Sequence, residues 1–211
     1  MTIKAFCFNP FYENTYIVYE DSREAWIFDP GCSNQSEEEE IIIFIKEKNL
    51  IVKKVLLTHA HIDHILGLDF ICRYFNLYPE MHELEKQVLD SAKQISLMYG
   101  ISYTAPSNKV MYIVDNQALR LSNSNILSIW TPGHSPGSLC YYFEKSNFLI
   151  GGDVLFEGSI GRTDLPGGDY NTLIHTIKTR LYPLGNEVVV YPGHGGLTTI
   201  GQEKLTNPFL N

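Results

Sequence analysis

One short segment limits what this chain can fold into more than any other feature. Residues 58–64, Thr-His-Ala-His-Ile-Asp-His, place three imidazoles and one carboxylate within six positions. The segment follows directly on residues 52–57, a short run rich in Val and Leu that is typical of a buried strand. Imidazoles crowded together depress one another's pKa and destabilise a fold unless a cation engages them. The sequence therefore predicts a metal site just beyond the end of a strand.

The spacing within this segment favours two ions rather than one. In an extended loop the two-residue period projects His59 and His61 to the same side, where they can share an ion. Asp63 and His64 are adjacent and fall where the next helix must begin, so they point elsewhere. That arrangement suits a second ion close to the first.

Three further residues can complete such a site. His134, Asp153 and His194 each follow a predicted strand and lie in a glycine-bearing turn, where the backbone can approach an ion closely. Each is weak evidence by itself, since an Asp after glycine at a strand end is more often a turn or a helix cap. Together with residues 58–64 they form a set of imidazoles and carboxylates, the ligands expected for zinc, iron, manganese or cobalt.

The order of predicted elements indicates two sheets with helices on their outer faces. A period of two residues marks the strands, and apolar stripes at helical spacing mark the helices. Ser36 with Glu39 three residues later predicts a capping box at the start of the first helix. The expected strands span 3–7, 15–20, 25–28, 52–57, 110–114, 118–122, 126–131, 139–144, 147–150 and 187–191, and the expected helices 37–48, 65–75, 84–99, 171–182 and from 199. The alternation repeats as two halves of a single domain, 1–211.

Composition limits the partners. The chain has 211 residues, a net charge of −8 and a pI near 5.3, which argues against nucleic acid and anionic membrane surfaces. No apolar run approaches the roughly 18 residues that span a bilayer. The N-terminus carries no secretion signal, and the four cysteines form no C-x-x-C pair. We therefore expect a cytoplasmic protein with reduced thiols that acts on a small molecule, and the sequence leaves its oligomeric state open.

The ordered motifs resemble a known family. Residues 58–64, Pro-Gly-His-Ser-Pro-Gly at 132–137, Gly-Asp at 152–153 and Pro-Gly-His at 192–194 look like the metallo-β-lactamase superfamily. The tail, at 161–165 and 207–210, resembles its glyoxalase II-like branch of short, hydroxyacylglutathione hydrolase-like enzymes. The resemblance covers nearly the whole chain. It implies an α/β fold, the αβ/βα four-layer sandwich, with two mixed sheets, helices on the outer faces and the site along one edge of both sheets.

The resemblance also assigns roles to the candidate residues. It implies two ligand sets joined by one bridge: His59, His61 and His134 for one divalent ion, Asp63, His64 and His194 for the other, and Asp153 for both. Zinc is the expected metal, with iron or manganese as alternatives. The positive charge of the two ions exceeds the negative charge of the two carboxylates and a hydroxide, so the centre attracts a developing oxyanion. A bridging hydroxide would attack a thioester or ester of a small anionic substrate, and Asp63 would orient it or accept its proton.

The sequence does not name the substrate. Only seventeen residues follow His194, where typical glyoxalase II enzymes carry a long helical segment that helps hold glutathione, which argues against glutathione thioesters as the main substrate. Arg162 is the natural contact for a substrate anion, and the alternative is a salt bridge with Asp164 or Asp169 that only fixes its loop. Asp29 either supports the histidine loop as a hydrogen-bond acceptor or simply forms a turn.

Other functions are alternatives to a hydrolase. A persulfide dioxygenase of the same family carries a similar Gly-Arg-Thr-Asp segment but uses a single iron, held by residues matching His59, His134 and Asp153. A metal-binding protein without turnover could use the same fold, although all seven ligand positions are occupied here. A secreted β-lactamase is disfavoured because no secretion signal is visible.

Overall fold

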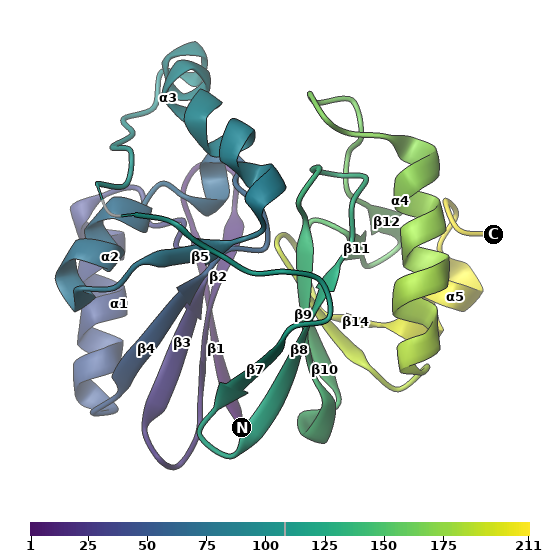
Figure 1. The fold of residues 1–211 in the computed structure, drawn as a ribbon, viewed down its shortest axis with the longest axis horizontal. Coiled ribbons are helices and arrows are strands. Elements are labelled where there is room, and N and C mark those ends of the chain that lie inside the picture. Colours follow the sequence, from purple (N-terminus) through teal and green to yellow (C-terminus); the bar gives the residue numbers. More distant parts are fainter. Residues whose placement is uncertain (108) are drawn as a thin grey trace.

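Two mixed sheets lie face to face in the computed structural model, which describes residues 1–107 and 109–211 (Figure 1). The N-terminal half of the chain forms the first sheet, in the order β1-β2-β3-β4-β5-β6. Its first three strands are an antiparallel meander, and the pairs from β3 to β6 are parallel. The strands are β1 (Thr2–Phe8), β2 (Glu13–Tyr19), β3 (Glu24–Phe28), β4 (Ile51–Leu56), β5 (Pro79–Met81) and β6 (Met111–Tyr112).

The C-terminal half forms the second sheet, in the order β14-β13-β10-β9-β8-β7. Only the β10–β13 pair is parallel, and a separate two-stranded ribbon, β11-β12, lies beside it. The strands are β7 (Ala118–Leu121), β8 (Ser124–Trp130), β9 (Leu139–Phe143), β10 (Phe148–Gly152), β11 (Leu155–Phe156), β12 (Ser159–Ile160), β13 (Val189–Pro192) and β14 (Thr198–Thr199).

Helices cover the outer face of each sheet. Three lie against the first sheet and two against the second, so the chain has four layers (Figure 1). They are α1 (Gln35–Glu47), α2 (Leu68–Phe75), α3 (Lys86–Tyr99), α4 (Tyr170–Thr176) and α5 (Ile200–Thr206). None of the helices in the described residues is long and apolar enough to cross a membrane.

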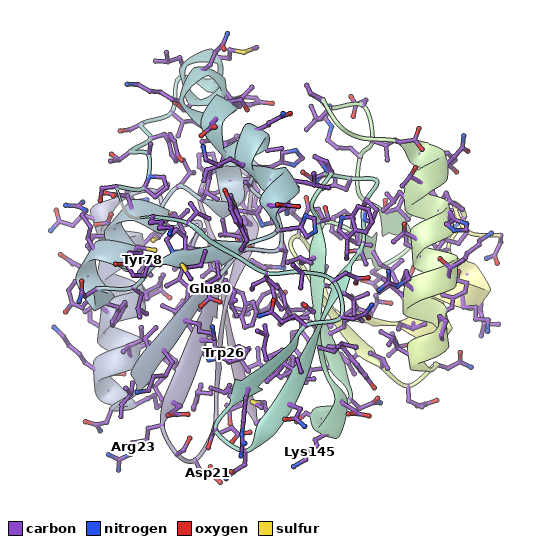
Figure 2. All side chains as sticks on the ribbon, viewed as in Figure 1. Asp21, Arg23, Trp26, Tyr78, Glu80 and Lys145 are labelled. Carbon is purple, nitrogen blue, oxygen red and sulfur yellow. The ribbon has the colours of Figure 1, made fainter. Side chains whose placement is uncertain are left out.

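Three apolar clusters hold these layers together, one between the sheets and one beneath each helical layer. Trp26, labelled in Figure 2, lies in the central cluster and is 1% exposed. Phe28 crosses from the first sheet to the second, with its ring centroid 5.2 Å from that of Tyr141. Aromatic pairs of this kind add to the free energy of burying their surface, so the central cluster joins the two sheets.

The predicted αβ/βα four-layer sandwich is confirmed, and the differences are local. The first helix is capped by Asn34 rather than by Ser36, because Asn34 has an extended backbone and its side chain accepts from Glu37 N–H at 3.1 Å. Asp169 rather than residue 171 caps α4, by accepting from Thr172 N–H at 2.7 Å. Strand β5 was not predicted, because three residues are too few to show a period of two.

Candidate metal centre

The candidate ligands come from loops at the ends of four strands, and these loops meet at one edge of the sandwich. The loop after β4 carries residues 59–64, in which a single 3₁₀ turn, Ile62–His64, redirects the chain. His134 follows β8, Asp153 follows β10 and His194 follows β13. The structure brings all seven predicted residues together, within the groups that could hold a cation.

His59, His61 and His134 form the first set. The Nε2 atoms of His59 and His134 lie 3.1 Å apart, and His61 Nδ1 lies 2.9 Å from His134 Nε2. Two ligands of a tetrahedral zinc ion lie about 3.3 Å apart, so these nitrogens converge as ligands do. Burial, helped by the neighbouring histidines, lowers the pKa of His59 and lowers that of His61 to about 3. The rings are therefore neutral at pH 7 and present lone pairs to a cation.

Asp63, His64 and His194 form the second set. His194 Nε2 lies 3.0 Å from Asp63 Oδ2, and His64 Nε2 lies 3.7 Å from the same oxygen. Burial disfavours charge on both rings, but the carboxylates of Asp63 and Asp153 outweigh it and raise the pKa of His64 and of His194. A cation that binds here therefore displaces protons, and its affinity falls as the pH falls.

Asp153 lies between the two sets. Its Oδ2 atom is 3.6 Å from His134 Nε2 and 3.5 Å from His194 Nε2, while its Oδ1 atom is 3.5 Å from His64 Nε2. Among the described residues, His64 Nε2 and Asp153 Oδ1 are buried without a hydrogen-bond partner. Leaving such an atom unpaired costs about 1–3 kcal/mol, and a divalent cation between them satisfies both. The residues present thus fit a metal centre.

The outer nitrogen of four of the five histidines is held by an oxygen atom. The Nδ1 contacts are His59 with Thr58 Oγ1 (3.0 Å), His64 with Asp29 Oδ2 (3.1 Å), His134 with the Arg162 carbonyl (2.7 Å) and His194 with the Phe11 carbonyl (3.1 Å). A carbonyl only accepts, so a ring held by one carries its proton on Nδ1 and turns the Nε2 lone pair to the centre. His61 is the exception, because its Nδ1 faces His134.

Asp29 supports one histidine of each set. It accepts from Thr58 N–H at 2.7 Å, from Thr58 Oγ1 at 2.6 Å and from His64 Nδ1 at 3.1 Å. Because the Thr58 hydroxyl donates to Asp29, it is left to accept from His59 Nδ1. The Asp29 backbone is left-handed, with a φ of 47°, and no turn is formed at residues 29–33. The contacts therefore favour the interpretation that Asp29 supports the histidine loop.

A second carboxyl group, Glu13, lies behind His64. It is fully buried, its Oε1 lies 3.9 Å from His64 Nδ1, and burial raises its pKa. Its Oε2 lies 2.9 Å from Thr15 Oγ1, which also accepts from Gly31 N–H and lies 2.7 Å from the Asp29 carbonyl. The Thr15 hydroxyl therefore has one proton to share between that carbonyl and Glu13, while burial favours the neutral form of the Glu13 carboxyl.

Glu85 is a buried carboxylate that the sequence analysis missed. Its Oε2 accepts from Ala60 N–H at 2.8 Å, and its Oε1 accepts from Ser135 Oγ at 2.6 Å and Gly137 N–H at 2.7 Å. It therefore joins the two loops that carry the first set. The sequence did carry a signal for this residue. Glu85 lies four residues before the buried Leu89, in line with the inward face of the following helix, and a charge buried there needs a partner.

Gly193, beside the centre, is required because no side chain would fit at its position. A Cβ at Gly193 would overlap Asp153 Oδ1 and approach within 2.7 Å of His64 Cε1. Its N–H donates to the Gly152 carbonyl at 2.9 Å, which draws the loop that carries His194 towards Asp153. The glycine predicted to allow a close approach does so here.

Arg162 lies at the rim of a cleft beside the centre rather than among the candidate ligands. Its Nε and Nη2 atoms donate to the two oxygens of Asp164, each at 2.7 Å, and its side chain is 56% exposed. Asp169 is not its partner but the cap of α4. The predicted salt bridge therefore exists, with Asp164, in a position that also faces the cleft.

An α/β sandwich that gathers imidazoles and carboxylates at one edge of two facing sheets has the arrangement of a metal-dependent enzyme. The sequence model of the metallo-β-lactamase superfamily matches residues 8–194. The chain belongs to this superfamily and is a metal-dependent enzyme.

Relatives agree with this assignment over their full length. The chain is 36% identical over 213 residues to "hydroxyacylglutathione hydrolase GloC" of Haemophilus influenzae, covering 100% of this chain and 99% of that one. Its fold superposes on BLEG-1 B3 metallo-β-lactamase with a TM-score of 0.90, 39% identity and 100% of both chains covered. It superposes on TTHA1623 "in a di-iron-bound form" with a TM-score of 0.88 and 33% identity, covering 98% of this chain and 100% of that one. The predicted superfamily is confirmed, and the GloC relative agrees with its glyoxalase II-like branch.

Proposed function

We propose that this enzyme hydrolyses thioesters with two divalent ions, most simply zinc, one held by each ligand set and both bridged by Asp153. The observation that carries the proposal is the position of Asp153, whose two oxygens face His64, His134 and His194 at 3.5–3.6 Å. A relative named for thioester hydrolysis and another with two irons support it. Iron and manganese suit the same ligands, so the test includes them.

Two ions held there supply hydroxide at neutral pH and polarise a carbonyl oxygen. Asp63 lines the cleft, and although burial opposes its ionisation, the charge of His64 lowers its pKa. As a carboxylate it can orient the attacking water and take its proton. The acyl–oxygen bond forms, the acyl–sulfur bond breaks, and the proton goes to the leaving thiolate.

Arg162 is the contact that we assign to an anionic group of the substrate. Among the described residues that line the cleft, it is the one cationic side chain. Two of its N–H groups bind Asp164, and the remaining ones are free to reach an anion at the rim. The small, anionic character of the substrate rests on this residue.

The test is an activity screen of the metal-depleted protein after reloading with zinc, manganese or iron. We expect lactoylglutathione and simpler thioesters to release thiol, with a maximum near two ions per chain. Oxygen consumption with glutathione persulfide at one iron per chain would contradict the proposal and favour a dioxygenase. Preferential hydrolysis of a β-lactam would contradict the thioester assignment, and no turnover with any metal would favour a binding protein.

A further inference from the structure

A cleft of about 490 Å³ opens directly beside the candidate metal centre. Its inner end is formed by His61, Asp63, His134 and Asp153, so a group bound in the cleft lies next to the reacting atoms. A cleft of this volume holds a substrate of ordinary metabolite size. The chemistry of its sides therefore indicates what is attached to the scissile carbonyl.

One side of the cleft is an apolar face of α3. Val88, Ala92, Ile95 and Tyr99 lie three or four residues apart, which places them in a row along one face of the helix. Ala92 is buried, and Val88 and Ile95 are partly buried. Figure 1 shows α3 above the first sheet. Ala92, Val88 and Ile95 pack partly on the core beneath the helix, and the surface that they leave uncovered lines the cleft.

The opposite side and the end of the cleft are also apolar. Leu165 and Pro166, from the loop after β12, lie across from α3. At the end, Phe11 and Tyr99 pack edge to face with ring centroids 5.4 Å apart. Because the Phe11 carbonyl also accepts from His194 Nδ1, the position of this aromatic pair is fixed relative to the centre.

The cleft offers little to a highly charged ligand. Apart from the candidate metal ligands, Arg162 is the one charged side chain among the described lining residues, and it is paired with Asp164 at the rim. Gln87, Ser91 and the hydroxyl of Tyr99 are the other polar groups among the described lining residues outside the candidate ligands. A substrate portion that carries several charges would lose water here without gaining partners, whereas an alkyl or aryl group would not.

We propose that the cleft binds an apolar group, alkyl or aryl, attached next to the scissile thioester, with any anion of the substrate held at the Arg162 rim. This inference rests on the proposed function and adds the class of substrate. The apolar group can belong to the acyl side or to the thiol side, because the cleft lies beside both candidate ion positions. Burying each added methylene raises kcat/KM about fourfold until the cleft is filled.

The experiment measures kcat/KM of the metal-loaded enzyme for two series of thioesters. One series lengthens the acyl group from acetyl to hexanoyl on N-acetylcysteamine, and the other lengthens an alkanethiol under a constant acetyl group. We expect a rise of about fourfold per methylene in one series, which identifies the side that enters the cleft. Values that stay flat or fall with length in both series, while hydrolysis is measurable, would overturn the inference.

Variants on α3 show whether the rise comes from this cleft. Ile95→Asn lowers the gain per methylene to less than about twofold, whereas Leu97→Asn, at a neighbouring position that is 74% exposed, retains it. Leu165→Ser repeats the test from the opposite side, in case Ile95→Asn fails to fold. An undiminished gain in both cleft variants would contradict the assignment.

Equilibrium binding separates this inference from the proposed function. The affinity of the zinc-loaded protein for n-alkyl carboxylates, from acetate to hexanoate, is measured by calorimetry without any turnover. An affinity that rises about fourfold per methylene supports the cleft even if no thioester is hydrolysed, in which case the proposed function alone fails. An affinity independent of length would contradict the cleft assignment directly.

Discussion

The two ligand sets of this centre lie side by side but are built from different chemistry. The first set consists of three neutral imidazoles, whereas the second includes Asp63 and backs onto the buried Asp29 and Glu13. An ion held by neutral nitrogens keeps more of its charge for a substrate oxygen than one held beside carboxylates. We therefore expect the first position to polarise the carbonyl and the second to stabilise the leaving thiolate.

The sets also differ in what holds them in place. Glu85 joins the two loops of the first set, and Asp29 contacts a ligand of the second set directly. Asp153 belongs to both. The centre is therefore supported by separate carboxylates, and each of them can be removed by itself.

The largest effect is expected at the residue that both sets share. Asp153→Asn removes a charged ligand from both positions, so kcat/KM for thioesters falls on the order of 10³-fold and the metal content falls below two per chain. Asp169→Asn is the matched control, because asparagine caps a helix as well as aspartate does. Steady-state kinetics and metal analysis measure both effects. Full metal content with normal activity in Asp153→Asn would contradict the assignment of Asp153 to both ions.

The next largest effect is expected at Asp29. Asparagine cannot accept all three of its hydrogen bonds, so Asp29→Asn lowers metal affinity about 10–100-fold. The loss falls mainly on the second set, because His64 contacts Asp29 directly while His59 does so only through Thr58. Competition with a chromophoric chelator resolves the two binding steps. Equal weakening of both binding steps would contradict the claim that Asp29 supports the second set more than the first.

Glu85→Gln tests the first set in the same way. An amide at this position turns N–H groups towards donors on one of the two loops, and we expect an affinity loss of about tenfold at the first set alone. Glu83→Gln, two residues earlier and exposed, is the matched control. The same chelator titration measures both variants, and a change confined to the second set would show that Glu85 does not support the first.

The smallest effect is expected at Arg162. Its salt bridge with Asp164 is solvent-exposed, so Arg162→Gln changes the free energy of unfolding by less than about 1 kcal/mol. Loss of its contact lowers kcat/KM about tenfold for an anionic thioester and leaves a neutral one unchanged. Parallel kinetics on the two substrates measures the selectivity. An equal change for both would mean that Arg162 only fixes its loop.

The sequence was sufficient for the sandwich and for the gathering of the ligands, because both follow from local patterns. The apolar run before His59 and the glycine turns before His134 and His194 place these candidate ligands at strand ends, and the strand ends share an edge. The organisation of the chain in two halves followed in the same way.

The support around the ligands could not be predicted, because it depends on contacts between distant segments. Glu85 meets Ser135 across a separation of 50 residues, and Phe11 meets His194 across 183. No local period encodes such pairs. The sequence could not show that Asn34 rather than Ser36 caps the first helix. Both residue types cap helices well, and the backbone conformation determines which of them does so.

The metal content of three proteins after reloading with zinc tests the two ligand sets most directly: the unmodified chain, His61→Ala in the first set and His194→Ala in the second. We expect two ions per chain for the unmodified protein and one for each variant, with thioester hydrolysis lost in both. One ion in the unmodified chain, or two ions with full activity in either variant, would contradict the two-set centre bridged by Asp153.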